Sequence, residues 1–430
     1  MDTDLLKTFQ QAYQDLDLFP LVKPEEIEHF RVEYMPEVLV RLKQEVNAST
    51  KNGKFVFAGH RGCGKSTLLK RFATEMQPQH FVVFFSIADL IEPSGVTHRN
   101  ILYAIGLQLL SAATKQQIPV AGDIQDSLLG WVTTTHKQKS EQTTKSEQGL
   151  GVDKLLQMAT LKFQREQAFR DEIERTYEKK VADLVGKLDR IAAAIQTTVK
   201  KTVLVVIDDL DKLDLSLVEA IYRDNIKALF SPQFRIVFTI PVSAIQEPQV
   251  MGALASEGIV RPQLFPVSKF FSKQDCRNPQ AEPIAKTLNT FLEVLRKRIP
   301  IERIEPATAR LMVLKSGGVM RELVRIAREC CTECMVQLEI EPDRTDIKID
   351  EAILTAALRN LRNDFARQIG TSLFPALVQV YKTLKGKDAD GDAFVKLLHG
   401  LMVLEYLNDD LWYDVHPIVV DLLRREGLIE

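Results

Sequence analysis

The segment that decides the fold of this chain spans residues 59 to 67 and reads Gly59-His60-Arg61-Gly62-Cys63-Gly64-Lys65-Ser66-Thr67. It matches the pattern G-x-x-x-x-G-K-[ST], whose glycines let backbone N–H groups turn toward phosphate oxygens. Residues 54–58 before it indicate a short buried strand, and residues 67–73 after it indicate the opening of a helix. Because a helix N-terminus adds partial positive charge where phosphates would lie, this order of elements predicts a phosphate-binding loop.

The side chains of this loop suit a nucleoside triphosphate bound with a metal ion. The Lys65 ammonium would reach the β- and γ-phosphates, and the Ser66 hydroxyl would ligate Mg²⁺. The residues predicted to bind the nucleotide are Gly59, Arg61, Gly62, Cys63, Gly64, Lys65, Ser66 and Thr67.

A second motif supports the first. Residues 202–207 form a continuous apolar run that ends in two carboxylates, Asp208 and Asp209. Continuous apolar runs are typical of central parallel strands, and ligands of such sheets bind at the carboxyl ends of the strands. We therefore expect Asp208 to hold Mg²⁺, through water, and Asp209 to orient the attacking water.

Composition sets the broad class. A chain of 430 residues with 45% hydrophobic residues predicts two or three domains with sizeable cores. The net charge of −2 carries no global sign of nucleic-acid binding, although a local basic face remains open. No stretch approaches 18 uninterrupted apolar residues, so no membrane span is expected. The acidic start, residues 1–4, lacks the pattern of a signal peptide, and a cytoplasmic location is expected.

The five cysteines do not predict a disulfide framework or a zinc site. Cys331 and Cys334 have the spacing C-x-x-C, but they fall in a helical pattern without a second Cys or His pair at zinc spacing. Buried helix cysteines are the favoured interpretation, and Cys63 is expected to act as a small filler in its loop.

The pattern along the chain predicts a helical extension over residues 1–50 and a nucleotide-binding core over 51–280. Further strands are expected over 81–87 and 235–240, with an edge strand over 264–267 that tolerates a proline. Residues 131–200 are predicted to be an insertion, which begins with a polar loop.

The rest of this insertion, 153–199, carries a short heptad seam: Tyr177, Val181, Leu184, Leu188, Ile191 and Ile195. Two interpretations stay open. It is either an inserted arm, a helical hairpin or coiled coil that binds a partner or forms an oligomer, or one amphipathic helix packed on the domain.

The C-terminal third predicts two further domains. Residues 281–366 read as helices, with a Gly317-Gly318 turn before a helix that carries Arg321 on its first turn. Residues 367–430 read as two helices, a strand–turn–strand unit over 401–415 and a closing helix. Helices followed by a β-hairpin are typical of a winged-helix domain.

With these residues in hand, the chain resembles AAA+ and STAND-type ATPases over roughly residues 20 to 335. The resemblance implies an α/β fold: a P-loop NTPase parallel sheet core with an inserted helical arm, an all-α lid and a C-terminal winged-helix-like α+β domain. It implies ATP rather than GTP, with Mg²⁺. The strand over 81–87 is expected to be an extra strand inserted between the P-loop strand and the Asp208 strand, which marks the same subdivision. Thr239 resembles the sensor-1 position and Arg321 the sensor-2 arginine, both of which contact the γ-phosphate region.

The chain departs from the AAA+ pattern in one place. Many AAA+ enzymes have Asp-Glu where Asp208-Asp209 stands, and the shorter Asp209 indicates slow, switch-like hydrolysis. Arg223 and Arg261 are candidates for the arginine finger that neighbours supply in AAA+ rings, but surface arginines are the favoured interpretation.

Two classes of function follow from the resemblance. The leading hypothesis is a signalling or defence-type ATP switch that acts through a protein partner or a homo-oligomer; the alternative is a DNA-linked initiator, loader or transposition regulator. A DNA-reading winged helix needs basic contacts. Here the hairpin turn 408–410 and its flanks Glu405 and Asp414 are acidic, and Lys396 is the only lysine of the presumed recognition helix. The lysines before that helix are offset by nearby acids: Lys382, Lys385 and Lys387 against Asp388, Asp390 and Asp392.

A chaperone-like remodeller is a third possibility. An inactive scaffold is disfavoured, because Lys65, Ser66 and Asp208 are all present.

Overall fold

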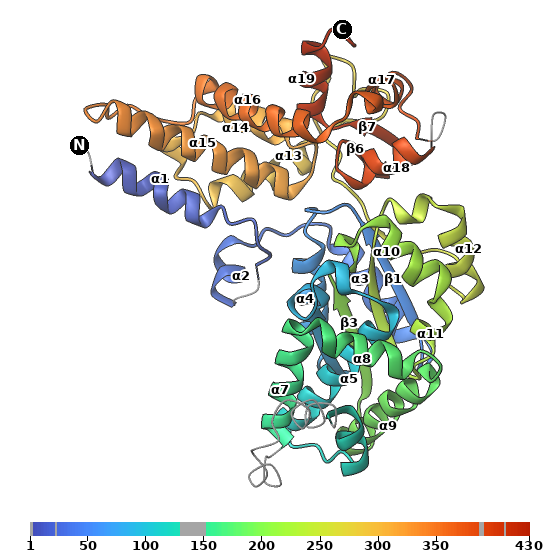
Figure 1. Cartoon of the computed structure of the whole chain (residues 1–430). Helices are drawn as coiled ribbons and strands as arrows, with labels where there is room; N and C mark the ends of the chain where they lie inside the picture. Colours follow the sequence, from blue (N-terminus) through green and yellow to red (C-terminus); the bar gives the residue numbers. More distant parts are fainter. Residues whose placement is uncertain (1–2, 22–23, 130–151, 387–390, 408–409) are drawn as a thin grey trace. The chain divides into compact units, whose positions relative to one another are not determined.

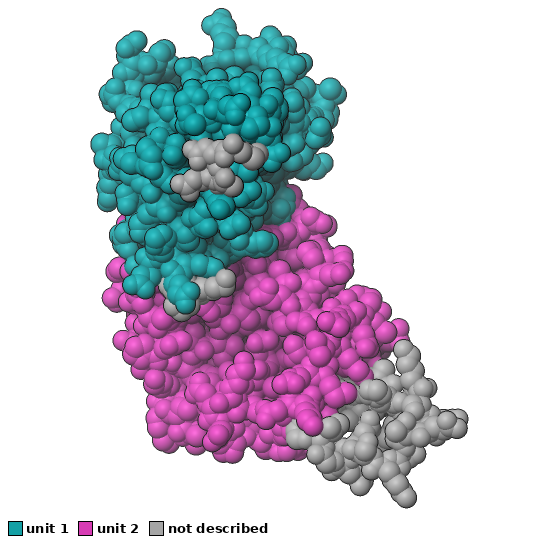
Figure 2. Space-filling view, turned by 90° about the vertical axis from the view of Figure 1, so that its left-hand side faces the viewer, with its two compact units in different colours: residues 1–36, 59–67, 265–430 teal, residues 37–58, 68–264 magenta. Residues whose placement is uncertain are grey.

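The computed structural model describes residues 3–21, 24–129, 152–386, 391–407 and 410–430 (Figure 1). The chain forms two compact units, shown in different colours in Figure 2. Unit 1 comprises residues 1–36, 59–67 and 265–430, and unit 2 comprises residues 37–58 and 68–264. The phosphate-binding loop therefore groups with the C-terminal half of the chain, and the four predicted segments stay a prediction.

Unit 2 is built on a five-stranded sheet with the order β2-β3-β4-β1-β5. Strand β2 pairs in parallel with β3, and β3 pairs in parallel with β4. The predicted strands are present, and the predicted edge strand lies at the sheet edge as β5. The bounds are β1 (Lys54–Gly59), β2 (His80–Ser86), β3 (Thr202–Asp208), β4 (Arg235–Pro241) and β5 (Gln263–Phe265).

The order of the strands corrects the expectation that the strand over 81–87 is the one inserted between the P-loop strand and the Asp208 strand. Strand β2, which lies between β1 and β3 in the chain, is at the edge of the sheet beyond β3. The strand that separates β1 from β3 in space is β4, which follows both in the chain. All seven residues of β4 are buried, as are Val203–Ile207 of β3, because continuous β-branched and aliphatic runs fit strands covered on both faces.

The predicted insertion is part of the core of unit 2. Helices α7 (Val152–Arg165), α8 (Gln167–Tyr177) and α9 (Val181–Val199) pack against α5 (His98–Lys115). An added Cβ at Gly106 of α5 would lie 2.9 Å from Leu188 Cδ2, so the two helices approach closely there. The seam residues are buried in the same core: Tyr177, Leu184, Leu188, Ile191 and Ile195.

Over residues 152–199 the structure therefore has three helices packed on the domain, in place of the single packed helix of one interpretation and of the coiled-coil-like arm of the other. A seam of so few turns cannot distinguish a coiled coil from an amphipathic helix on a domain, because their periods differ by only about 0.1 residue per turn. The polar loop predicted over 131–150 lies outside the described residues.

Unit 1 begins with α1 (Thr3–Asp15), which packs along α15 (Met320–Ile340). Helix α15 also contacts α13 (Ala285–Arg296), α14 (Pro306–Lys315) and α16 (Glu351–Gln368). The chain then forms α17, α18, the hairpin and α19, at Phe374–Thr383, Gly391–His399, β6 (Val403–Leu407), β7 (Leu411–Val415) and Pro417–Arg425. The predicted hairpin is present as an antiparallel pair in which Tyr406 faces Trp412.

Gly317 and Gly318 form the turn before α15, both with positive φ. A Cβ at Gly318 would lie 1.6 Å from the carbonyl oxygen of Ser268, so only glycine fits there. The carbonyl of Gly317 accepts a hydrogen bond of 2.7 Å from the Tyr406 hydroxyl, which ties this turn to the hairpin.

The remaining described helices of four or more residues flank these elements. They include α2 (Pro24–Phe30), α3 (Pro36–Ala48), α4 (Lys65–Met76), α10 (Leu215–Glu219), a π-helical turn over Ala220–Asp224, α11 (Ile226–Phe230) and α12 (Pro248–Ser256), and residues 122–129 are helical as well. In the part of the chain that the structure describes, none of the helices combines the length and the apolar character that crossing a bilayer requires.

Cys330, Cys331 and Cys334 are buried on α15, as expected for helix cysteines in a core. Burial raises the pKa of the Cys331 thiol to about 12, which disfavours the thiolate that a metal or an electrophile would need.

Candidate nucleotide site

The loop of residues 59–67 joins the end of β1 to the start of α4, as the motif predicts. Gly62 and Gly64 have φ of +80° and +97°, a region that favours glycine. A Cβ added at Gly64 would meet no atom within 4 Å, whereas one at Gly62 would lie 2.6 Å from Arg321 Cβ. Gly64 thus leaves open space beside the backbone, which suits a phosphate, and Gly62 allows the close approach of α15.

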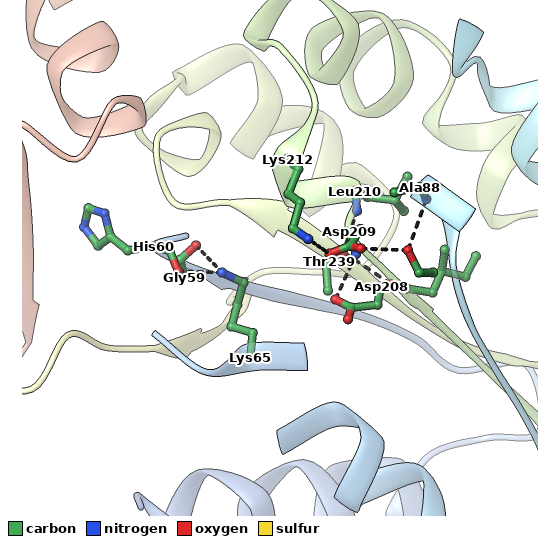
Figure 3. Close-up of polar contacts among 11 residues, drawn as sticks. Gly59, His60, Lys65, Ala88, Asp208, Asp209, Leu210, Lys212 and Thr239 are labelled. Carbon is green, nitrogen blue, oxygen red and sulfur yellow. Dashed lines mark hydrogen bonds and ion pairs between the residues drawn. The ribbon is translucent and has the colours of Figure 1, made fainter. Parts of the chain in front are cut away.

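The Lys65 side chain is buried and lies over the carbonyls of its own loop. Its Nζ donates to Gly59 O at 3.0 Å and to His60 O at 2.6 Å (Figure 3). Two carbonyl dipoles thus bind the ammonium group of a lysine that is only 4% exposed. A phosphate group is an anion, and its oxygens would compete for the same hydrogens.

In unit 2, three carboxylates lie within four consecutive residues at the end of β3. Asp208, Asp209 and Asp211 each offer an oxygen, and these oxygens lie within 4.8 Å of one another. In the described ranges, this is the one group of His, Cys, Asp and Glu side chains that converges in this way. Hard divalent cations prefer carboxylate oxygens, so the group fits Mg²⁺.

Asp211 is a site residue that sequence reasoning missed. It is buried, with 2% of its surface exposed. Asp209 adopts the left-handed conformation, with φ 70° and ψ 6°, which turns the chain directly after the strand and precedes a short 3-10 turn containing Asp211. An acidic residue three positions after the strand end is the only signal that could have pointed to it.

The Asp209 carboxylate is engaged at both oxygens. Its Oδ1 lies 2.6 Å from Lys212 Nζ (Figure 3). Its Oδ2 accepts a hydrogen bond of 2.7 Å from Ser86 Oγ. Ser86 ends β2, where the parallel register sets it beside Asp208. Neither Ser86 nor Lys212 is distinctive in the sequence, so only the fold reveals this contact.

Thr239 lies on β4, fully buried, next to the turn that follows β3. Its Oγ1 accepts the N–H of Leu210 at 3.0 Å and donates to Ile207 O at 3.3 Å. Its own carbonyl accepts the Tyr222 hydroxyl at 2.8 Å. The structure therefore shows Thr239 as a brace for the Asp208–Asp209 turn, and a contact of Thr239 with the γ-phosphate stays a prediction.

Arg321 meets the loop through its backbone. Its N–H donates to Gly62 O at 2.9 Å, at the first turn of α15. The neighbouring Glu322 is buried, and burial raises the pKa of this carboxyl despite the nearby guanidinium groups of Arg325 and Arg321. Unit 1 thus brings together the predicted loop and the predicted lid arginine.

The two arginine-finger candidates, Arg223 and Arg261, both belong to unit 2, and their contacts there are with groups other than the carboxylates at the end of β3. Arg223 Nη1 contacts Glu219 Oε2 at 2.6 Å, and its Nε contacts Asp224 Oδ1 at 2.8 Å, which are surface ion pairs. Arg261 lines a shallow pocket with Lys54–Val56, at the start of β1, whereas the loop follows the other end of that strand.

The comparisons with known proteins gave structural similarities only. No family model matches the chain, and no curated protein matches it. The Walker-type ATPase PABY2304 of Pyrococcus abyssi is similar in structure, with 15% identity, a TM-score of 0.45, and 95% of this chain and 99% of that chain covered.

Two further solved structures are similar over most of their length. The Aeropyrum pernix ORC1 protein in complex with DNA has 11% identity, a TM-score of 0.40, and 97% of each chain covered. Drosophila ORC bound to DNA has 11% identity and a TM-score of 0.35, with 96% of this chain and 91% of that chain covered. These sequences differ from the present one at most positions, and nothing about its reaction follows from them.

The class of fold follows from this chain's own elements. A glycine-rich phosphate-binding loop after β1, carboxylates at the end of β3, and β4 between those two strands define the α/β fold of P-loop NTPases.

Proposed function

We propose that this protein is an ATP-binding and ATP-hydrolysing conformational switch of the AAA+ and STAND type. The observation that carries the proposal is the phosphate-binding loop itself. It combines the buried Lys65 ammonium with open space beside Gly64, and its fold supplies a converging carboxylate group after β3. Strands of a parallel sheet end at the same edge, which is where ligands of α/β sheets bind.

The residues of this chain fit Mg²⁺ as well as ATP. Ser66 and Asp208 are the proposed ligands, and the carboxylate oxygens of Asp208, Asp209 and Asp211 are the donors that a hard cation prefers. Bound with the nucleotide, Mg²⁺ would neutralise charge on the phosphates. Lys65 would leave the two loop carbonyls and donate to the phosphate oxygens instead.

Asp209 is the proposed residue that orients water. Its carboxylate contacts Ser86, at the end of β2, and β2 lies on the far side of β3 from β4 and β1. The phosphate-binding loop continues from β1. Hydrolysis therefore requires the carboxylate to leave this arrangement, which supports slow turnover.

Arg321 is proposed to report the state of the nucleotide to the lid. Its backbone already binds Gly62 O, and its side chain packs beside Gly62. A γ-phosphate that engages Arg321 would hold α15 differently from a diphosphate, and the lid helices would move with it.

The output of the switch is proposed to be a protein contact or an oligomer. The acids Glu405 and Asp414, which the sequence suggested as a DNA-repelling wing, are internal: Glu405 is 5% exposed, and Asp414 Oδ2 accepts from Arg277 Nη1 at 2.8 Å. The case against DNA therefore rests on α18, which buries five of its nine residues and exposes Lys396 as its only lysine.

The test is the mass in solution, measured by light scattering with ATP–Mg²⁺, with ADP and without nucleotide. Wild type and Asp209→Asn are compared, because the variant is expected to bind ATP and lose 10²- to 10⁴-fold of its turnover. Growth to a defined oligomer with ATP alone supports the switch. Lys65→Ala should bind no nucleotide, and normal binding in that variant refutes the site. Salt-dependent binding to a DNA duplex would favour the DNA-linked alternative.

A further inference from the structure

Three consecutive residues of the phosphate-binding loop each contact a different element of unit 1. His60 Nε2 accepts the N–H of Glu405 on β6 at 2.9 Å. Arg61 Nη2 lies 2.9 Å from His399 Nε2 on α18, and Gly62 O accepts the Arg321 N–H on α15. The third contact belongs to the lid already described, whereas the first two join the loop directly to the C-terminal elements.

The His60 contact has a defined chemistry. The ring is 3% exposed, and because Nε2 accepts a backbone N–H, the neutral ring carries its proton on Nδ1. The backbone carbonyl of the same residue accepts the Lys65 ammonium at 2.6 Å. His60 thus binds the Lys65 ammonium through its backbone and the hairpin through its side chain.

Arg61 adds a second tie of the same kind. A guanidinium group is always a donor, so His399 Nε2 must be the acceptor in this pair. In the Arg61–His399 pair the loop residue is the donor, whereas in the His60–Glu405 pair the hairpin residue is the donor. Both ties use side chains at variable positions of the loop motif, so they are properties of this chain and not of the motif.

We propose that His60 and Arg61 couple the phosphate-binding loop directly to the β6–β7 hairpin and α18, so that filling the loop loosens these elements. The proposal rests on the proposed function, since phosphate must draw the Lys65 ammonium off the His60 carbonyl. Residue 60 then loses a bond that fixes its backbone, and its side chain no longer holds the Glu405 N–H in place. By thermodynamic reciprocity, a variant without the His60 acceptor binds nucleotide more tightly.

The hairpin carries its own reporter. The chain has two tryptophans, Trp131 and Trp412. Trp412 lies on β7, 2% exposed, and its ring stacks on Tyr406 with centroids 4.6 Å apart. Tyr406 in turn binds Gly317 O through its hydroxyl. In a Trp131→Phe background, Trp412 emission reports whether the hairpin keeps its packing.

The experiment titrates ATP–Mg²⁺ into this background protein and records Trp412 emission together with the Kd for ATP. We expect emission to shift to longer wavelength as the loop fills. His60→Leu should show that shifted emission without nucleotide and bind ATP about 2- to 10-fold more tightly, the range that one hydrogen bond supplies. His60→Gln places an amide oxygen near the Nε2 position and should restore both wild-type values.

The controls separate the coupling from the function. His29→Leu, at an exposed histidine of α2, should change neither readout. His399→Leu removes the Arg61 partner while every residue of the loop stays unchanged, and it should act in the same direction as His60→Leu, which keeps the test decisive if the His60 variant fails to fold. If ATP binds the wild type but leaves Trp412 unchanged, with equal Kd values in all variants, the coupling is overturned. If ATP binds none of these proteins, the proposed function itself fails.

Discussion

The Nζ atom of Lys212 lies 2.6 Å from Oδ1 of Asp209, the carboxylate proposed to orient water. The Lys212 side chain is 40% exposed and that of Asp209 is 11% exposed, so the lysine is the more solvent-exposed partner of this ion pair. Because Ser86 holds the other oxygen, Lys212 and Ser86 together retain Asp209 at the β2 side of the turn.

Lys212→Met should therefore raise turnover. Without this partly exposed ion pair, the free energy needed to release the Asp209 carboxylate falls by about 0.2–1 kcal/mol. The rate of hydrolysis should then rise about 1.5- to 5-fold, with the Kd for ATP unchanged. Steady-state ATP hydrolysis and equilibrium binding measure the two quantities. The matched control is Lys227→Met, at an exposed lysine of α11. A lower rate in the Lys212 variant would mean that the ion pair holds Asp209 in its working position.

Thr239→Val should lower stability, because the hydroxyl braces the turn after β3. Valine has nearly the same shape but leaves the Leu210 N–H without its 3.0 Å acceptor. An unsatisfied buried donor costs about 1–3 kcal/mol, measurable by urea unfolding. Thr239→Ser keeps the hydroxyl and should recover most of this free energy. Recovery of stability without recovery of ATP turnover would show that Thr239 has a role beyond the brace.

The strands of unit 2 could be predicted from the sequence because each is a continuous apolar run beside a turn. Their order could not, since β4 reaches its place between β1 and β3 only through long-range pairing. The helices of residues 152–199 show the same limit. Their apolar seam indicates a buried face, and only the packing on α5 identifies what buries it.

The candidate site divides in the same way. Lys65, Asp208 and Asp209 could be identified because the motifs specify them by residue type and spacing. Ser86 and Asp211 could not. Ser86 lies at the site because of the parallel register of β2 and β3. Asp211 lies there because Asp209 adopts the left-handed conformation, which cannot be predicted from the sequence.

Gly318→Ala should destabilise unit 1 severely. The added Cβ would lie 1.6 Å from the carbonyl oxygen of Ser268, a backbone atom that cannot rotate away, and φ is already +83°. We expect a loss above about 4 kcal/mol or no folded protein. The matched control is Gly427→Ala, where φ is +69° but no atom lies within 4 Å, so only the conformational cost of about 1–2 kcal/mol applies. Equal losses in the two variants would contradict the close contact.

The pH dependence of stability should reveal His416, which is fully buried at the start of α19. Its Nδ1 accepts the Ile418 N–H at 3.3 Å, and burial, followed by the charges of Arg325 and Lys315, lowers the pKa of this imidazole from 6.5 to about 3. Between these two values the unfolded chain binds a proton that the folded chain excludes, so this contribution to stability is complete above pH 6.5 and declines as the pH falls toward 3.

His416→Asn keeps an acceptor for the helix N-terminus and removes the titration. From pH 7.5 to pH 5.5, the variant should lose about 1 kcal/mol less unfolding free energy than the wild type, as measured by urea unfolding at both pH values. The carboxylates contribute equally to the pH dependence of both proteins, so their contribution cancels when the two unfolding free energies are subtracted. His29→Asn, at an exposed histidine, should follow the wild-type pH profile. Identical pH dependence in wild type and His416→Asn would mean that the folded protein accepts the proton at His416, and that its surroundings are more open than the buried contact with Phe365 indicates.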